Sequence, residues 1–183
     1  MASTATLETL LGDWKKLLTD WAASGQLTAA AQDALQLSGE PKLLKQLVKQ
    51  WSRADFSALP PIVLLSSSSM PGAAGAYAIS TGTIYLNQDW LQTASKDSVL
   101  AVLTEELGHH LDGLLNVVDA PGDEGEVFAA QLILKGTASA LRDNDQSFID
   151  INGKIMQAEL AALPPTPAIL VFGTTASDVY KRQ

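Results

Sequence analysis

The chain has 183 residues, of which 46% are hydrophobic and 17% charged, a composition typical of a folded domain rather than a disordered segment. Its formal net charge of −8 excludes the basic surface that nucleic acids and anionic membranes require, so we expect neither as a partner. The absence of cysteine excludes disulfides and thiolate metal sites. Apolar runs fall short of the roughly 18 residues of a membrane span, and the start of the chain lacks the pattern of a signal peptide.

The first 59 residues are predicted to be helical. Apolar residues recur at three-and-four spacing from residue 6 to residue 23, which indicates an amphipathic helix. A shorter helix is expected over residues 28–37, and Pro41 can begin a third. The tryptophans of these helices are expected to lie in the core: Trp14, Trp21 and Trp51.

Strands and two further helices are predicted downstream. The stretch "PPIVLL" predicts a short buried strand, and "AYAIS" and "TIYLN" flank a turn, which indicates a hairpin. A second hairpin is expected around Asn152-Gly153 in "FIDINGKIMQAEL". Between the hairpins we expect a helix over about 97–115, capped by Ser95, and another over 124–135.

These elements predict an α+β fold in three segments. A helical amino-terminal part covers 1–59, a mixed core covers 60–160, and a linker with a tail covers 161–183. The tail "SDVYKRQ" resembles a translated sequencing adapter, so we expect the natural chain to continue in a different sequence.

The chain holds only two histidines, and they stand side by side in "TEELGHHLD". At about 100° per residue, Glu105, His109 and Asp112 fall on one side of the predicted helix and its leucines on the other. Glu105 and His109 are one turn apart and can point at one metal ion, although two surface histidines among solvated acids would give the same pattern. Gly108, unfavourable within a helix by about 1 kcal/mol, indicates a close backbone approach. His110 is predicted to be a packing or surface residue.

The segment from about residue 60 to 135 resembles the zincin metallopeptidases through "TIYLN", "SVLAVLTEELGHHLD" and "GDEGEVFAAQL". It most resembles zincin-like domains at the front of large cyanobacterial proteins with hemolysin-type calcium-binding repeats. The resemblance implies a zincin-like fold, in which a strand precedes the metal-binding helix and a later helix brings a third ligand. It also implies zinc as the cofactor, an extended peptide or protein as the partner, and an extracellular location. Another divalent metal and a cytoplasmic location stay open, and the oligomeric state is unknown.

The resemblance implies a role for each matching residue. His109 corresponds to the second histidine of the H-E-x-x-H motif, and Glu106 corresponds to its general base. Glu126, in "EGEVFA", corresponds to the third metal ligand. Glu105 stands where the family has its first histidine, and Asp112 corresponds to an acidic residue that orients a histidine ligand.

The acidic cluster "DEGE" allows a second interpretation. Asp123 and Glu126 are three residues apart at a helix start, which is the spacing of a capping box. Such a capping box would fix the position of the helix that carries Glu126. Asp123 would then support the metal ligands without being one of them. Glu124 is expected to be a solvated charge of the first helical turn.

A carboxylate in place of the first histidine changes the expected chemistry. Two carboxylates cancel the charge of a divalent ion, so water at the site would be less acidic than in a good zinc hydrolase. An oxygen-rich site is also less selective for zinc over Mn²⁺ or Fe²⁺. The sequence therefore leaves two functions open: a weak or degenerate metal-dependent peptidase, and an inactive zincin-fold module for structure or binding. In the peptidase, strand 83–87 is expected to form a sheet edge that pairs with an extended peptide.

Overall fold

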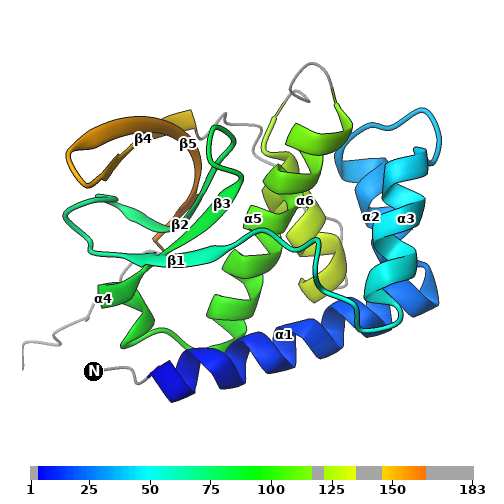
Figure 1. The fold of residues 1–183 in the computed structure, drawn as a ribbon, viewed down its shortest axis with the longest axis horizontal. Helices are drawn as coiled ribbons and strands as arrows, with labels where there is room; N and C mark the ends of the chain where they lie inside the picture. The colour runs from blue at the N-terminus through cyan, green and yellow to red at the C-terminus, as the bar shows by residue number, and fades with distance from the viewer. Residues whose placement is uncertain (1–3, 117–121, 135–145, 164–183) are drawn as a thin grey trace, which may run out of the picture.

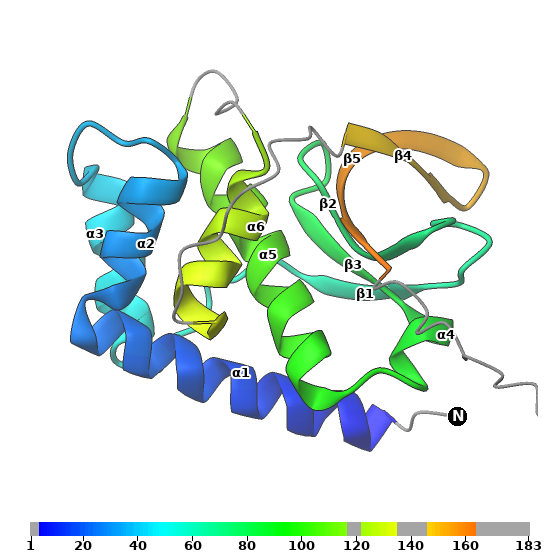
Figure 2. The same ribbon diagram turned by 180° about the vertical axis from the view of Figure 1, so that it is seen from behind.

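The computed structural model describes residues 4–116, 122–134 and 146–163 and has the predicted α+β fold. Helix α1 (Thr4–Ser24) crosses the base of the molecule, and α2 (Gln26–Ala34) and α3 (Lys42–Trp51) stand together at one side (Figures 1 and 2). Helices α5 (Lys96–Leu115) and α6 (Glu124–Ala129) lie in the middle, and the sheet lies on the other side. None of the described helices is both long and apolar enough to cross a membrane.

The sheet has five strands in the order β1-β3-β2-β5-β4. Strand β1 (Ile62–Leu65) is parallel to β3 (Thr83–Asn87), while β2 (Ala73–Ala78), β5 (Lys154–Ala162) and β4 (Gln146–Ile151) follow in antiparallel pairing. Both predicted hairpins are confirmed. The β4–β5 turn has the two positive φ values that favour Asn-Gly, 55° at Asn152 and 82° at Gly153.

Two expectations about the strands are wrong. Strand β3 is paired on both sides, by β1 and β2, so residues 83–87 have no free edge for a peptide. The edges of the described sheet are β1 and β4. The segment "IVLL" was expected to be buried, but as the edge strand β1 it leaves Val63 42% exposed and Leu64 37% exposed. An apolar run alone does not distinguish an edge strand from a central one.

The helices agree with the sequence to within a few residues. Helix α5 begins after Ser95, whose side chain accepts a hydrogen bond from the backbone N–H of Ser98 at 3.1 Å, as a helix cap does. The predicted helix 124–135 is two elements, because α6 continues as a π-helix (Ala130–Leu134). The four-residue α4 (Gln88–Leu91) was not predicted, although Asn87 caps it by accepting from the N–H groups of Asp89 and Trp90.

One hydrophobic core joins the amino-terminal helices to α5. The indole N–H of Trp14 in α1 donates to Thr104 Oγ1 in α5 at 3.1 Å, and both residues are fully buried. Strand β5 runs to Ala162, and Ala161 is 1% exposed, so the core continues past residue 160, where the linker was expected to begin. The rest of that linker and the tail "SDVYKRQ" lie outside the described residues. The three tryptophans predicted for the core are buried: Trp14, Trp21 and Trp51.

Candidate metal centre

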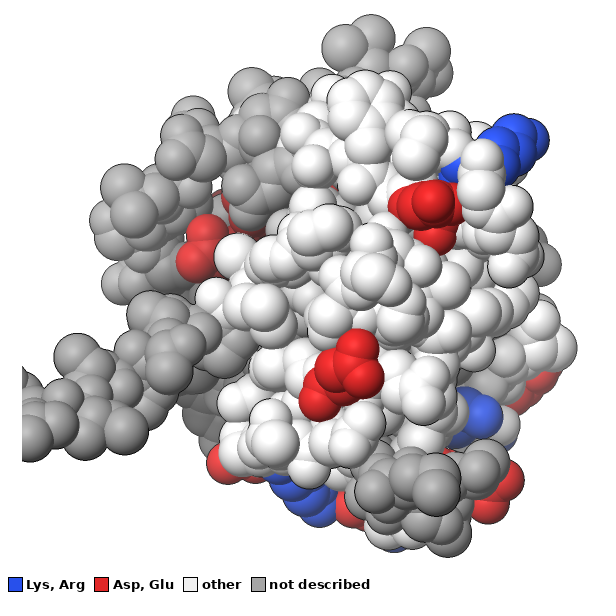
Figure 3. Space-filling view, turned by 90° about the vertical axis from the view of Figure 1, so that its left-hand side faces the viewer, with Lys and Arg blue, Asp and Glu red and all other residues white. Residues whose placement is uncertain are grey.

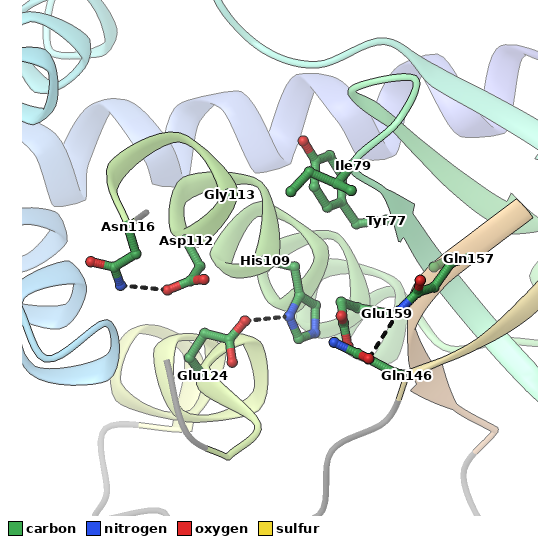
Figure 4. Close-up of a pocket in the computed structure, with 11 residues that line it drawn as sticks. Tyr77, Ile79, His109, Asp112, Gly113, Asn116, Glu124, Gln146, Gln157 and Glu159 are labelled. Atoms are coloured by element: carbon green, nitrogen blue, oxygen red, sulfur yellow. Dashed lines mark hydrogen bonds and ion pairs between the residues drawn. The ribbon is translucent and has the colours of Figure 1, made fainter. Parts of the chain in front are cut away.

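Helix α5 carries two residues of the site, Glu105 and His109. The two sides of this helix face different surroundings. Its leucine side is fully buried in the core, with Leu103, Leu107 and Leu111 at 0% exposure. The other side carries Glu105 and His109, and Figure 4 shows the His109 side chain between α6 and the β4–β5 hairpin. The amphipathic pattern therefore fixes the direction in which the acidic and imidazole groups point.

A pair of glycines brings α6 against α5. A Cβ atom on Gly108 would lie 2.8 Å from the Cα atom of Gly125, so the two backbones touch at this point. The close approach predicted from Gly108 is confirmed. A Cβ atom on Gly125 would overlap the imidazole of His109, so only glycine leaves room for that ring beside the first turn of α6.

Three side chains converge into a group that could hold a metal ion: Glu105, His109 and Asp123, whose potential ligand atoms all lie within 4.8 Å of one another. His109 Nε2 lies 3.8 Å from Asp123 Oδ1. The same nitrogen is buried and makes no hydrogen bond, which is rare because buried polar atoms in folded proteins are nearly always hydrogen-bonded. One imidazole and two carboxylates are acceptable ligands for zinc and for other divalent transition metals. The residues therefore fit a metal ion.

Glu124 holds the imidazole from its other side. Glu124 Oε1 lies 3.0 Å from His109 Nδ1, and Glu124 is only 5% exposed (Figure 4). The expectation that Glu124 is solvated is thus wrong, because the close contact of α6 with α5 buries its first turn. A carboxylate on Nδ1 leaves Nε2 as the nitrogen available to a metal.

The acidic surroundings also favour a proton on His109. Burial opposes the charge, but the hydrogen bond to Glu124 and the negative charges of Glu106, Glu124 and Asp123 outweigh it. Together they raise the pKa of His109 to about 10. A metal ion at Nε2 would take the place of that proton.

Glu126, the predicted third ligand, does not join this group. It is exposed, whereas Glu124, Gly125 and Phe128 form the buried side of α6. Its backbone N–H donates to Asp123 Oδ1 at 2.7 Å, which confirms Asp123 as the helix cap. Asp123 thus takes the place that the sequence assigned to Glu126. The cap residue precedes the first turn, and at that position its carboxylate lies next to His109.

Asp112 accepts a hydrogen bond from Asn116. It is 4% exposed, and its Oδ1 accepts a hydrogen bond from Asn116 Nδ2 at 2.6 Å. Asn116 Nδ2 also donates to the backbone oxygen of Leu35, which follows α2, at 3.0 Å. The carboxylate that contacts His109 Nδ1 is that of Glu124, while the predicted orienting role of Asp112 stays a prediction.

Glu106 lies at the contact between α5 and the sheet and is completely buried. Its Oε1 accepts a hydrogen bond from the backbone N–H of Ala161 in β5 at 3.1 Å, and its Oε2 has no hydrogen-bond partner. Burial raises the pKa of Glu106 well above its usual range, and attraction to His109 opposes the rise. A raised pKa makes the carboxylate a stronger base than an exposed glutamate, which favours its taking up a proton.

Of the two places predicted for the second histidine, packing or surface, the structure shows packing. His110 is 7% exposed, and its Nδ1 lies 3.1 Å from the hydroxyl of Tyr77 in β2. Burial lowers the pKa of His110 to about 4 and raises the pKa of Tyr77. His110 is therefore neutral at pH 7 and belongs to the contact between helix and sheet.

A cavity of about 200 Å³ adjoins the metal-binding group. It lies between α5, the first turn of α6 and the β4–β5 hairpin (Figure 4), and His109 is the described residue common to the cavity wall and the metal-binding group. Its described lining residues are Tyr77, Ile79, His109, Asp112, Gly113, Asn116, Glu124, Gln146, Gln157, Ala158 and Glu159.

Comparison with known proteins gives no relative. A scan against protein-family models, a search of curated proteins and a search of solved structures each found no match. Any functional conclusion must therefore rest on the residues and geometry of this chain.

Proposed function

We propose that this chain is a zincin-like, metal-dependent peptidase domain in which Glu105, His109 and Asp123 hold a zinc ion. The observation that carries the proposal is the convergence of these three side chains around His109 Nε2, which is buried and makes no hydrogen bond. The glycine contact and the Glu124 hydrogen bond support it, since both fix the imidazole in the position that a ligand needs.

Each residue has a part in the proposed hydrolysis. When bound, the metal supplies a Lewis acid that polarises the peptide carbonyl and makes water more acidic. Glu106 is the general base: its unpartnered Oε2 accepts the proton of the attacking water and passes it to the leaving amine. Glu124 holds His109 in a fixed tautomer, and Asp123 both binds the metal and begins the helix that carries Glu124.

A second function, a metal-binding module without turnover, is favoured by the surroundings of Glu106. Its side chain is fully buried, and one of its oxygens is hydrogen-bonded to the backbone of β5. Those contacts would serve a carboxyl group that joins α5 to the sheet equally well. The same three ligands would then hold a metal that stabilises the contact of α5 with α6.

Metal binding is the first test. Calorimetric titration with zinc should give one site per chain, weakened at least tenfold by Asp123→Asn. Glu126→Gln is the matched control, because it removes one charge from an exposed neighbour, and its affinity should equal that of the original chain. Glu105→His should bind zinc more tightly, since it restores the imidazole of the family motif. Absence of stoichiometric zinc, or an equal loss in Glu126→Gln, would reject the proposed site.

Hydrolysis is the second test, and it separates the two functions. The zinc-loaded chain and its Glu106→Gln variant are compared on a casein substrate. Activity that the variant lacks supports Glu106 as the base. Zinc binding without activity in either protein supports the module, and equal activity in both removes Glu106 from catalysis.

A further inference from the structure

The cavity beside the metal-binding group has an unusual lining for a hollow of its size. Three carboxylates face it, from Asp112, Glu124 and Glu159. Its described lining includes no lysine or arginine, and its one cationic group is the imidazole of His109, whose pKa is raised to about 10. Amide groups add further hydrogen-bonding atoms, with Gln157 Nε2 donating to Gln146 Oε1 at 2.9 Å. On the face in Figure 3, by contrast, some acidic side chains stand among uncharged residues and others lie beside lysine or arginine. With three carboxylates and one imidazole, the described lining is net negative.

A second observation indicates that the cavity receives a ligand. His109 forms part of its wall, is 3% exposed, and has an Nε2 atom with no hydrogen-bond partner. Figure 4 shows this nitrogen on the side of the ring that faces Glu159 and Gln146, opposite the nitrogen bonded to Glu124. The cavity and the position of a metal at Nε2 are therefore neighbours.

The ligand that fits is an organic cation rather than a second metal ion. Among the described residues, the only set of three metal-binding side chains within 4.8 Å is Glu105, His109 and Asp123, so the cavity carboxylates do not converge on one point. They are spread around a hollow of about 200 Å³, below the roughly 300 Å³ at which pockets for whole small molecules begin. A single side chain with a positive head group suits that size.

The apolar part of the wall matches the stem of such a side chain. Tyr77 contributes an aromatic ring, and Ile79 contributes an aliphatic side chain that is 65% exposed. Lysine and arginine pack their methylene groups on apolar surface while their charged ends reach polar partners. The guanidinium of arginine offers five N–H donors in a fixed plane, which suits several carboxylate and amide acceptors around it.

We propose that this cavity binds the side chain of an arginine or lysine next to the bond that the metal site cleaves. The inference rests on the proposed function and names its substrate class: peptides with a basic residue beside the scissile bond. A peptide whose carbonyl reaches the metal at His109 would place the adjacent side chain in the cavity, because His109 belongs to both.

The binding test uses the metal-free full-length chain, so that its result does not depend on zinc. N-acetyl-arginine methylamide is compared with the uncharged N-acetyl-citrulline methylamide by titration in an NMR experiment. The arginine compound should bind at least tenfold more tightly. Glu159→Gln, which removes one charge from the cavity, should weaken it at least threefold, and Glu8→Gln, which removes one exposed charge in α1, should not. Ile79→Lys alters an exposed position and should abolish binding by supplying its own cation.

Each outcome decides the proposal. Equal affinity for arginine and citrulline, or an equal loss in Glu8→Gln and Glu159→Gln, would overturn it. Failure of the proposed peptidase function would give a different result from failure of the cavity inference. Arginine binding without zinc binding would support the cavity inference and reject the peptidase. If the zinc-loaded chain cleaves peptides, those with arginine beside the scissile bond should be cleaved at least tenfold faster than those with citrulline. Equal rates would reject the cavity inference alone.

Discussion

The contact between Gly125 and His109 offers a direct test of the site's geometry, through the substitution Gly125→Ala. The added methyl group would overlap the imidazole, which its other contacts hold in place. It is buried, its Nδ1 is hydrogen-bonded to Glu124, and its Nε2 side faces Asp123. Either the ring or the whole of α6 must therefore shift.

The expected effects follow from that overlap. Forcing a methyl group into a packed interior is unfavourable by about 1–3 kcal/mol, and alanine returns about 1 kcal/mol as a better helix former than glycine. We expect a net destabilisation of up to about 2 kcal/mol, with a fall in Tm of about 2–4 °C for each kcal/mol. Zinc affinity should fall at least tenfold, because one of the three ligands moves away.

Gly12→Ala is the matched control for thermal unfolding and zinc titration. Gly12 also lies inside a helix, α1, but a Cβ atom there would meet nothing within 4 Å. It should therefore show the gain in helix stability without the overlap. If Gly125→Ala matched this control in stability and kept the zinc affinity of the original chain, the described packing of α5 against α6 would be incorrect.

Three further predictions concern the surroundings of the site. Glu124→Gln removes the negative charge beside His109 Nδ1 and should lower zinc affinity by about 10–100-fold in a chelator competition; an unchanged Kd would show that Glu124 does not orient the ring. The lowered pKa of His110, about 4, means that on acidification the unfolded chain takes up a proton near pH 6.5 and the folded chain only near pH 4. Stability should therefore fall between these values, by roughly 3 kcal/mol at most from this group, and urea unfolding should show a smaller fall in His110→Gln. The same pH dependence in both proteins would contradict the burial of this imidazole. Gly75→Ala would put a methyl group 2.6 Å from Glu106 Oε1 and should lower the free energy of unfolding by about 1–3 kcal/mol; unaltered urea unfolding would mean that β2 does not press on α5.

Local patterns were sufficient to predict most elements of the fold. The periodicity of α1 and α5, the cap at Ser95 and the turn at Asn152-Gly153 are each decided by residues close together in the chain. The position of a strand within the sheet is decided by distant partners instead. Strand β3 was therefore assigned to an edge, although β1 and β2 enclose it.

The candidate site could be predicted only in part, because one of its three residues depends on contacts between distant parts of the chain. Glu105 and His109 are one turn apart on one helix, so helical geometry alone brings them together. The third member depends on how α6 lies against α5, and the family pattern pointed to Glu126 instead of Asp123. The sequence did hold a signal in Gly125: a glycine within the first turn of a helix allows a side chain of another element to lie against its backbone.

The hydrogen bond between Trp14 and Thr104 makes the amino-terminal helices part of the scaffold behind the site. It closes a loop of 90 residues and anchors the side of α5 opposite the ligands. A chain that started at residue 60 would expose the leucines of α5 to water, and its histidine would lose the rigid support that directs it. Removing the first three helices should therefore abolish metal binding, although all three proposed metal-binding residues would still be present.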